Sequence, residues 1–144
     1  MRCSLTIAGV VIVTAICCLA AKETVQQLMA RADTARPEDR PGLYVEIAER
    51  QLKAADESFG GGKDEDALAA VRDVVKYSEK AHDAAIAAHN KLKGTEISLR
   101  KMAAKLRDIK HTLTFEDQGP VQAAADRLEA LRTDLLAKMF GKGK

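Results

Sequence analysis

Apolar residues recur at every third or fourth position through most of this chain, with polar residues between them. The stretch over residues 64–114 contains no proline and keeps this spacing in a single heptad phase. Its a positions are Val71, Ser78, Ala85, Leu92, Leu99, Leu106 and Leu113, and its d positions are Ala67, Val74, Ala81, Ala88, Thr95, Met102 and Ile109. Such a repeat is typical of an α-helix that packs along one stripe. We therefore predict one long helix over residues 64–114, roughly 75 Å if straight, with Gly94 as the internal position that favours a bend.

Shorter helices are predicted before and after this stretch. Apolar residues at helical spacing fill residues 22–35 and stop before Pro37, because the residue before a proline disfavours the helical conformation. A second set over residues 43–59 ends at the three glycines Gly60–Gly62, since glycine adopts a helix-ending conformation without strain. Pro120 fits the first position of a last helix. The predicted fold is therefore all-α, with shorter helices packed antiparallel at both ends of the long helix.

The first 21 residues differ from the rest of the chain. A basic start, Met1-Arg2, precedes an apolar run over residues 5–19 and the small pair Ala20-Ala21, which is the pattern of a secretory signal peptide. All three cysteines (Cys3, Cys17 and Cys18) lie in this segment, so its removal would leave a chain without disulfides. We predict cleavage after Ala20 or Ala21 and export, to the periplasm or out of the cell. The alternative is an uncleaved N-terminal anchor, and only then do we expect contact with a membrane.

After this leader, the composition suits one helical domain over residues 22–140 and a frayed tail over 141–144. The formal net charge is only +2, so the chain as a whole is not drawn to nucleic acid. Lys and Arg cluster over residues 91–110, but no aromatic residues alternate with them, so we interpret the cluster as a solvated helix face and expect no nucleic-acid partner. No nucleophile elbow, zinc-protease motif or dinucleotide fingerprint occurs, so we expect neither catalysis nor a cofactor.

One short run resembles a known helical repeat. The segment Gly62-Lys63-Asp64-Glu65-Asp66-Ala67-Leu68, with the small pair Ala54-Ala55 before it, resembles the turn and second-helix start of a tetratricopeptide hairpin. The resemblance covers Gln51 to Val75. In that family, small residues let two helices pack closely, and stacked hairpins form surfaces that bind peptides or partner proteins. The resemblance thus implies a helical hairpin and a role in partner binding.

Three residues of the predicted long helix are candidates for a metal site. Glu79 and His82 have the spacing by which a carboxylate and a histidine share one metal ion in di-iron helical bundles, and His89 follows one heptad later. A complete centre would need further ligands from other helices. A metal- or cofactor-binding helical bundle centred on Glu79, His82 and His89 is therefore one hypothesis.

The other hypothesis is a surface for a protein partner. If shorter helices cover both ends of the long helix, its stretch from about residue 82 to 92 stays uncovered. The predicted contact residues are then His82, Ala85, His89 and Leu92. We favour this interpretation: an exported helical scaffold or protein–protein interaction module of the bacterial cell envelope, with an unidentified partner. A homo-oligomer formed through the small residues of the heptad seam is a further option.

Overall fold

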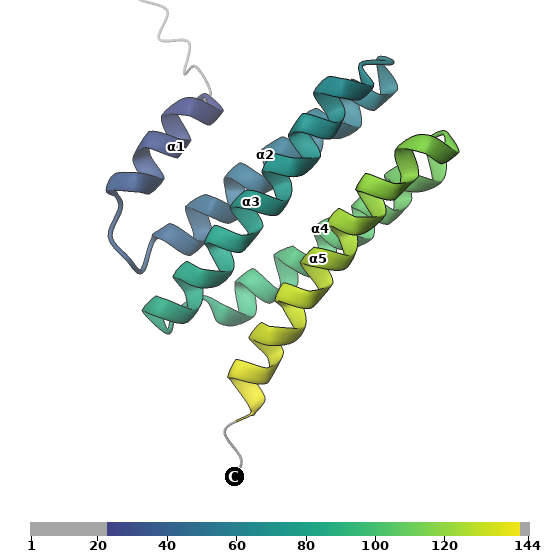
Figure 1. Cartoon of the computed structure of the whole chain (residues 1–144). Helices are drawn as coiled ribbons and strands as arrows, with labels where there is room; N and C mark the ends of the chain where they lie inside the picture. Colours follow the sequence, from purple (N-terminus) through teal and green to yellow (C-terminus); the bar gives the residue numbers. More distant parts are fainter. Residues whose placement is uncertain (1–22, 142–144) are drawn as a thin grey trace, which may run out of the picture.

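The computed structural model describes residues 23–141 (Figure 1). Within this part of the chain lie five α-helices: α1 (Val25–Thr34), α2 (Arg40–Gly60), α3 (Asp64–Ala88), α4 (Leu92–Thr112) and α5 (Phe115–Phe140). The prediction of an all-α fold is confirmed. The predicted leader with its three cysteines, and the last three residues of the predicted tail, lie outside the described residues.

The single long helix predicted over residues 64–114 is not what the structure contains. The chain reverses between Ala88 and Leu92, where His89 and Lys91 adopt left-handed backbone conformations with φ of 48° and 57°. The Asn90 N–H donates to the carbonyl of Ala85 at 3.2 Å, a bond that closes the end of α3. The Asn90 side chain in turn accepts from the Lys91 N–H at 2.8 Å. The break therefore lies at residues 89–91 and not at Gly94, which is exposed in the first turn of α4.

The reversal turns one long heptad stripe into two helical hairpins. α2 pairs with α3, and α4 pairs with α5; the two hairpins lie side by side, with α3 next to α5 and α2 next to α4 (Figure 1). Both hairpin turns point to the same end of the molecule, so α3 and α5 run in the same direction. α2 ends at the glycines as predicted, and Gly62 in the turn that follows adopts a φ of 70°.

The last helix begins at Phe115, five residues before the predicted start at Pro120. Thr114 precedes the helix in an extended conformation, and its hydroxyl lies 2.8 Å from a carboxylate oxygen of Asp117. Glu116 and Asp117 place negative charge in the first turn, where free backbone N–H groups favour it. Pro120 thus lies inside the helix, near its N-terminus. The acidic residues of the first turn, and not the proline, indicate where the helix begins.

α3 and α5 bury the same pattern of positions. The buried residues of α3 include Ala67, Ala70, Val71, Val74, Tyr77 and Ala81, and those of α5 at identical spacing are Val121, Ala124, Ala125, Leu128, Leu131 and Leu135. Residues three and four apart lie on one face of a helix, so each helix turns one stripe to the shared core. The residues beside these stripes face each other across the boundary between the two parallel helices, and there the candidate site lies.

Candidate functional site: the groove between α3 and α5

Three hollows follow one another along the boundary of α3 and α5. On α3 they are lined by Leu68, Val71, Arg72, Val75, Glu79, His82, Asp83, Ile86 and His89, and on α5 by Pro120, Ala123, Ala124, Arg127, Ala130, Leu131, Asp134, Lys138 and Met139, with Leu92 of α4 at the far end. The steps along each helix are mostly three or four residues, so the hollows lie on one side of the boundary. We call them together the α3–α5 groove; from Leu68 to His89 it extends about 30 Å.

The apolar third of the groove lies nearest the hairpin turns. Leu68 and Val75 of α3 are half-buried there, and Pro120 and Ala123 of α5 are exposed opposite them. The hollow has a volume of about 360 Å³, at the small end of the range for ligand pockets. Its charged members, Arg72 and Arg127, are both cationic. This third can therefore take apolar side chains beside a carboxylate.

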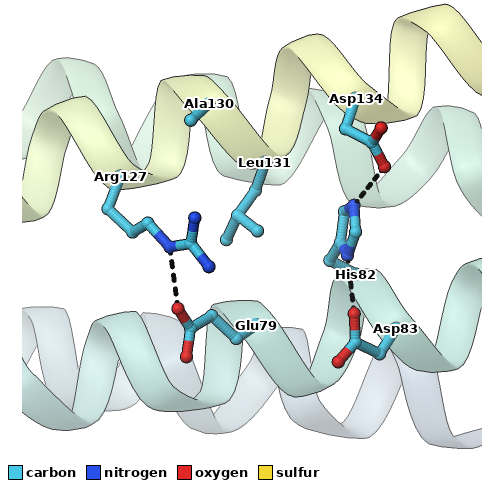
Figure 2. Close-up of a pocket in the computed structure, with 7 residues that line it drawn as sticks. All are labelled: Glu79, His82, Asp83, Arg127, Ala130, Leu131 and Asp134. Atoms are coloured by element: carbon cyan, nitrogen blue, oxygen red, sulfur yellow. Dashed lines mark hydrogen bonds and ion pairs between the residues drawn. The ribbon is translucent and has the colours of Figure 1, made fainter.

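The polar third is crossed by an ion pair between the two helices. Figure 2 shows Arg127 of α5 reaching across to Glu79 of α3, and the Arg127 Nε donates to Glu79 Oε1 at 2.7 Å. The two side chains are 52% and 40% exposed, so water screens much of their attraction. Exposed pairs of this kind contribute about 0–1 kcal/mol to stability. The pair bridges the groove but stabilises it only modestly.

His82 makes a second link between the helices. Its Nδ1 lies 2.8 Å from Asp83 Oδ1, and its Nε2 lies 2.9 Å from Asp134 Oδ2 of α5 (Figure 2). The imidazole is only 11% exposed, whereas Asp134 is 47% exposed. A neutral imidazole has one N–H and an imidazolium has two, so only the protonated ring donates to both carboxylates at once. His82 is thus a positioned contact between α3 and α5.

The basic third lies at the far end, where the α3–α4 turn meets the last turn of α5. Ile86, His89 and Leu92 line it from the turn side, and Lys138 and Met139 line it from α5. Ile86, Leu92 and Met139 are half-buried, while His89 and Lys138 are exposed. The groove thus changes along its length from apolar to polar to a mixture of apolar and basic side chains.

Polar contacts away from the groove hold α4 against α5. Glu96 is 7% exposed and accepts from the Arg132 Nε at 2.6 Å. The hydrogen bond that Arg132 donates to Glu96, and then the one that it donates to Glu129, raise the pKa of its guanidinium above the ordinary value. In the other hairpin, burial raises the pKa of the Tyr77 hydroxyl, and the nearby Lys80 ammonium partly opposes this shift. The contact between Glu96 and Arg132 thus links α4 to α5 within one hairpin.

The three candidate metal ligands point to different partners. Glu79 faces Arg127, the two ring nitrogens of His82 face different carboxylates, and His89 lies about 10 Å further along α3. Within residues 23–141, no group of three or more His, Cys, Asp or Glu side chains is arranged to hold a metal ion.

The four predicted contact residues do not share one uncovered surface. His82, His89 and Leu92 line the groove, but Ala85 is fully buried beneath it. The expected gap over residues 82–92 is covered in part by α5, because the chain reversal brings α5 alongside α3. The α5 side of the groove, including Ala123, Arg127 and Asp134, was missed from sequence for the same reason.

Comparison of the chain with protein-family models, with curated proteins and with solved structures finds no match. In the described part of the chain, every helix is too short or too polar to span a membrane.

Proposed function

We propose that this protein is a non-catalytic interaction module of the bacterial cell envelope, whose α3–α5 groove binds an amphipathic helix of a partner protein. The observation that carries the proposal is the groove itself, about 30 Å long and apolar at one end. A partner helix of about 15 residues spans the apolar and polar thirds, from Leu68 to Asp83, and leaves the basic third free. The cell-envelope location rests on the signal-peptide pattern of the first 21 residues.

The lining of the apolar third supports a helix as the occupant. Leu68, Arg72 and Val75 present side chains at intervals of three and four residues, and helices pack by placing ridges of this spacing into each other's grooves. Small side chains at Ala123 and Ala124 leave room for larger apolar residues of the incoming helix. Helix-in-groove recognition of this kind uses apolar anchors at i, i+3, i+4 and i+7.

The charges beside the apolar third define the partner further. Arg72 is exposed, and among residues 23–141 the structure gives it no ion-pair partner; Arg127 uses its Nε for Glu79. A carboxylate beside the apolar stripe of the partner helix would therefore find a cation at the rim. We expect such a rim contact to affect the rate and specificity of association more than affinity. The proposed partner is thus an amphipathic helix with acidic residues along one edge.

The proposal is tested by photo-cross-linking in the native cells. A photoreactive amino acid replaces Ala123, which lines the apolar third, or Ala104, which is also exposed but lies on α4 outside the groove. We expect a discrete adduct from position 123 and none from 104. Mass spectrometry should place the cross-link on an amphipathic helix of another protein, and Arg72→Glu should weaken the adduct because it reverses the rim charge.

Three outcomes would contradict this proposal. Equal adducts from positions 123 and 104 would show that the cross-link reports crowding and not the groove. An adduct with a second copy of the chain would show that the groove binds the protein itself and not another protein. If Arg72→Glu leaves the yield of the adduct unchanged or raises it, the partner helix does not carry the proposed acidic edge. Circular dichroism of each variant confirms that the helices are intact.

A further inference from the structure

The end of the molecule opposite the hairpin turns combines one exposed and several half-buried apolar side chains with lysines. We define this basic end by Ile86, His89, Lys91, Leu92, Lys93, Lys138, Met139 and Phe140. Figure 1 shows the α3–α4 turn and the end of α5 at the same end of the molecule, and the hollow of the basic third joins them. Phe140 is 78% exposed and, within residues 23–141, shares this degree of exposure among large apolar residues only with Phe115 at the hairpin-turn end. The basic end is therefore one surface built from two distant segments.

The charges of this surface are all of one sign. Residues 84–95 and 135–141 contain three lysines and no Asp, Glu or Arg. The nearest carboxylates along the chain are already engaged: Asp83 and Asp134 contact His82, and Glu96 pairs with Arg132. Asp39, which lines a hollow with Lys91, is paired with Arg36 at 3.0 Å. Within residues 23–141, Lys91, Lys93 and Lys138 are exposed and make no ion pair, and the Lys91 ammonium lies beside Gly42 of α2.

We propose that the basic end docks onto the anionic headgroups of a lipid bilayer, with Phe140 and Met139 entering the interface. Lysines around exposed apolar residues are the composition of surfaces that lie on anionic membranes. A protein partner fits less well, because protein interfaces are enriched in Arg and depleted in Lys, and this surface has the opposite composition. Long lysine side chains also keep their charge at the headgroups while their stems lie on apolar groups.

This docking differs from the membrane contact expected from sequence, which depended on retention of the first 21 residues. It uses the opposite end of the chain and a local charge that the net charge of +2 conceals. It is also independent of the α3–α5 helix-binding role, since the proposed partner helix enters the groove at the apolar third.

The absence of Trp from the sequence allows a specific test. Phe140→Trp places the single Trp at the basic end, and Phe115→Trp places it at the hairpin-turn end, where Phe115 is 89% exposed. The full chain is mixed with phosphatidylcholine vesicles, with or without phosphatidylglycerol. We expect the emission of Phe140→Trp to shift to shorter wavelength only with phosphatidylglycerol and to revert at high salt. Phe115→Trp should not shift.

Lysine variants test the charge. Lys91→Gln, Lys93→Gln and Lys138→Gln together should weaken binding to the anionic vesicles by about 100-fold, at about five-fold per lysine. Lys53→Gln, Lys63→Gln and Lys101→Gln change the net charge equally on other exposed surfaces and should have little effect.

If the apolar N-terminal segment inserted into the bilayer, it would bind the chain to neutral and anionic vesicles alike. The emission of a Trp at position 140 would then not differ between the two kinds of vesicle. The proposal is overturned if Phe140→Trp responds equally to neutral and anionic vesicles, or if both Trp variants shift alike. It is also overturned if the two lysine triples bind equally. A Phe140→Trp shift that needs no lipid and grows with protein concentration would assign the surface to a second copy.

Discussion

His82 lies between two carboxylates, and only one of them belongs to another helix. Asp83 is its neighbour in sequence, lies on the same helix and is 80% exposed. That contact therefore orients the ring but does not link two helices. Asp134 lies on α5, and its contact with the nearly buried imidazole links the two hairpins. A buried polar atom that loses its partner costs more than an exposed one, because water cannot replace the bond. The Asp134 contact is therefore the more consequential polar link across the groove.

A matched pair of variants tests this difference. Asp134→Ala leaves one ring nitrogen of the buried imidazole without its partner, so we expect a loss of about 1 kcal/mol in the free energy of unfolding. Glu79→Ala removes the exposed pair with Arg127 and should cost less than about 0.5 kcal/mol. Urea denaturation followed by circular dichroism measures both. An equal or larger loss for Glu79→Ala would show that the His82 contact does not link the helices.

At the scale of elements, the heptad pattern predicted the buried faces but not the chain reversal. Leu99, Leu106 and Ile109 are buried as their a and d positions predict, as are Val71 and Val74. The same phase continues through residues 89–91, so periodicity alone could not distinguish one helix from two. The signal for the break was local: three polar residues, His89-Asn90-Lys91, with an Asn that tolerates turn conformations.

Two substitutions test where the chain reverses. His89→Gly places glycine at a left-handed position and should stabilise the protein by about 1 kcal/mol. Gly94→Ala adds a methyl group to an open helical position and should also stabilise it, by about 0.5–1 kcal/mol. Thermal unfolding measures both. A continuous helix would give the opposite sign for His89→Gly, because glycine inside a helix is destabilising.

The α3 side of the candidate site could be predicted from the sequence, and the α5 side could not. Leu68 and Val75 directly follow d positions and widen the apolar stripe of α3, which already indicated room for a second neighbour. The identity of that neighbour depends on the fold: a straight helix would leave α5 beside residues 92–114 alone, whereas the reversal also places it beside α3. Pairings such as Glu79 with Arg127 join residues far apart in sequence, and a single sequence carries no local signal for them.

At the scale of the whole molecule, the two parallel helices give the protein one long groove and one basic end. The apolar third lies toward the hairpin turns and the lysines lie at the opposite end, so the proposed partner and the proposed bilayer would not compete. A molecule docked through the basic end would present the apolar third away from the membrane. Both proposals depend on α5 lying beside α3, and that arrangement is the central claim.

The most direct test is a distance between the two walls of the groove. Spin labels at Arg72→Cys and Ala123→Cys, in a chain whose three native cysteines are replaced by Ser, allow pulsed electron paramagnetic resonance. Both positions line the apolar third, and packed helices lie about 8–10 Å apart, so we predict a distance below about 25 Å. An unbroken helix over residues 64–114 with the last helix folded onto its second half would give more than about 50 Å. That longer distance would contradict the hairpin arrangement and the groove with it.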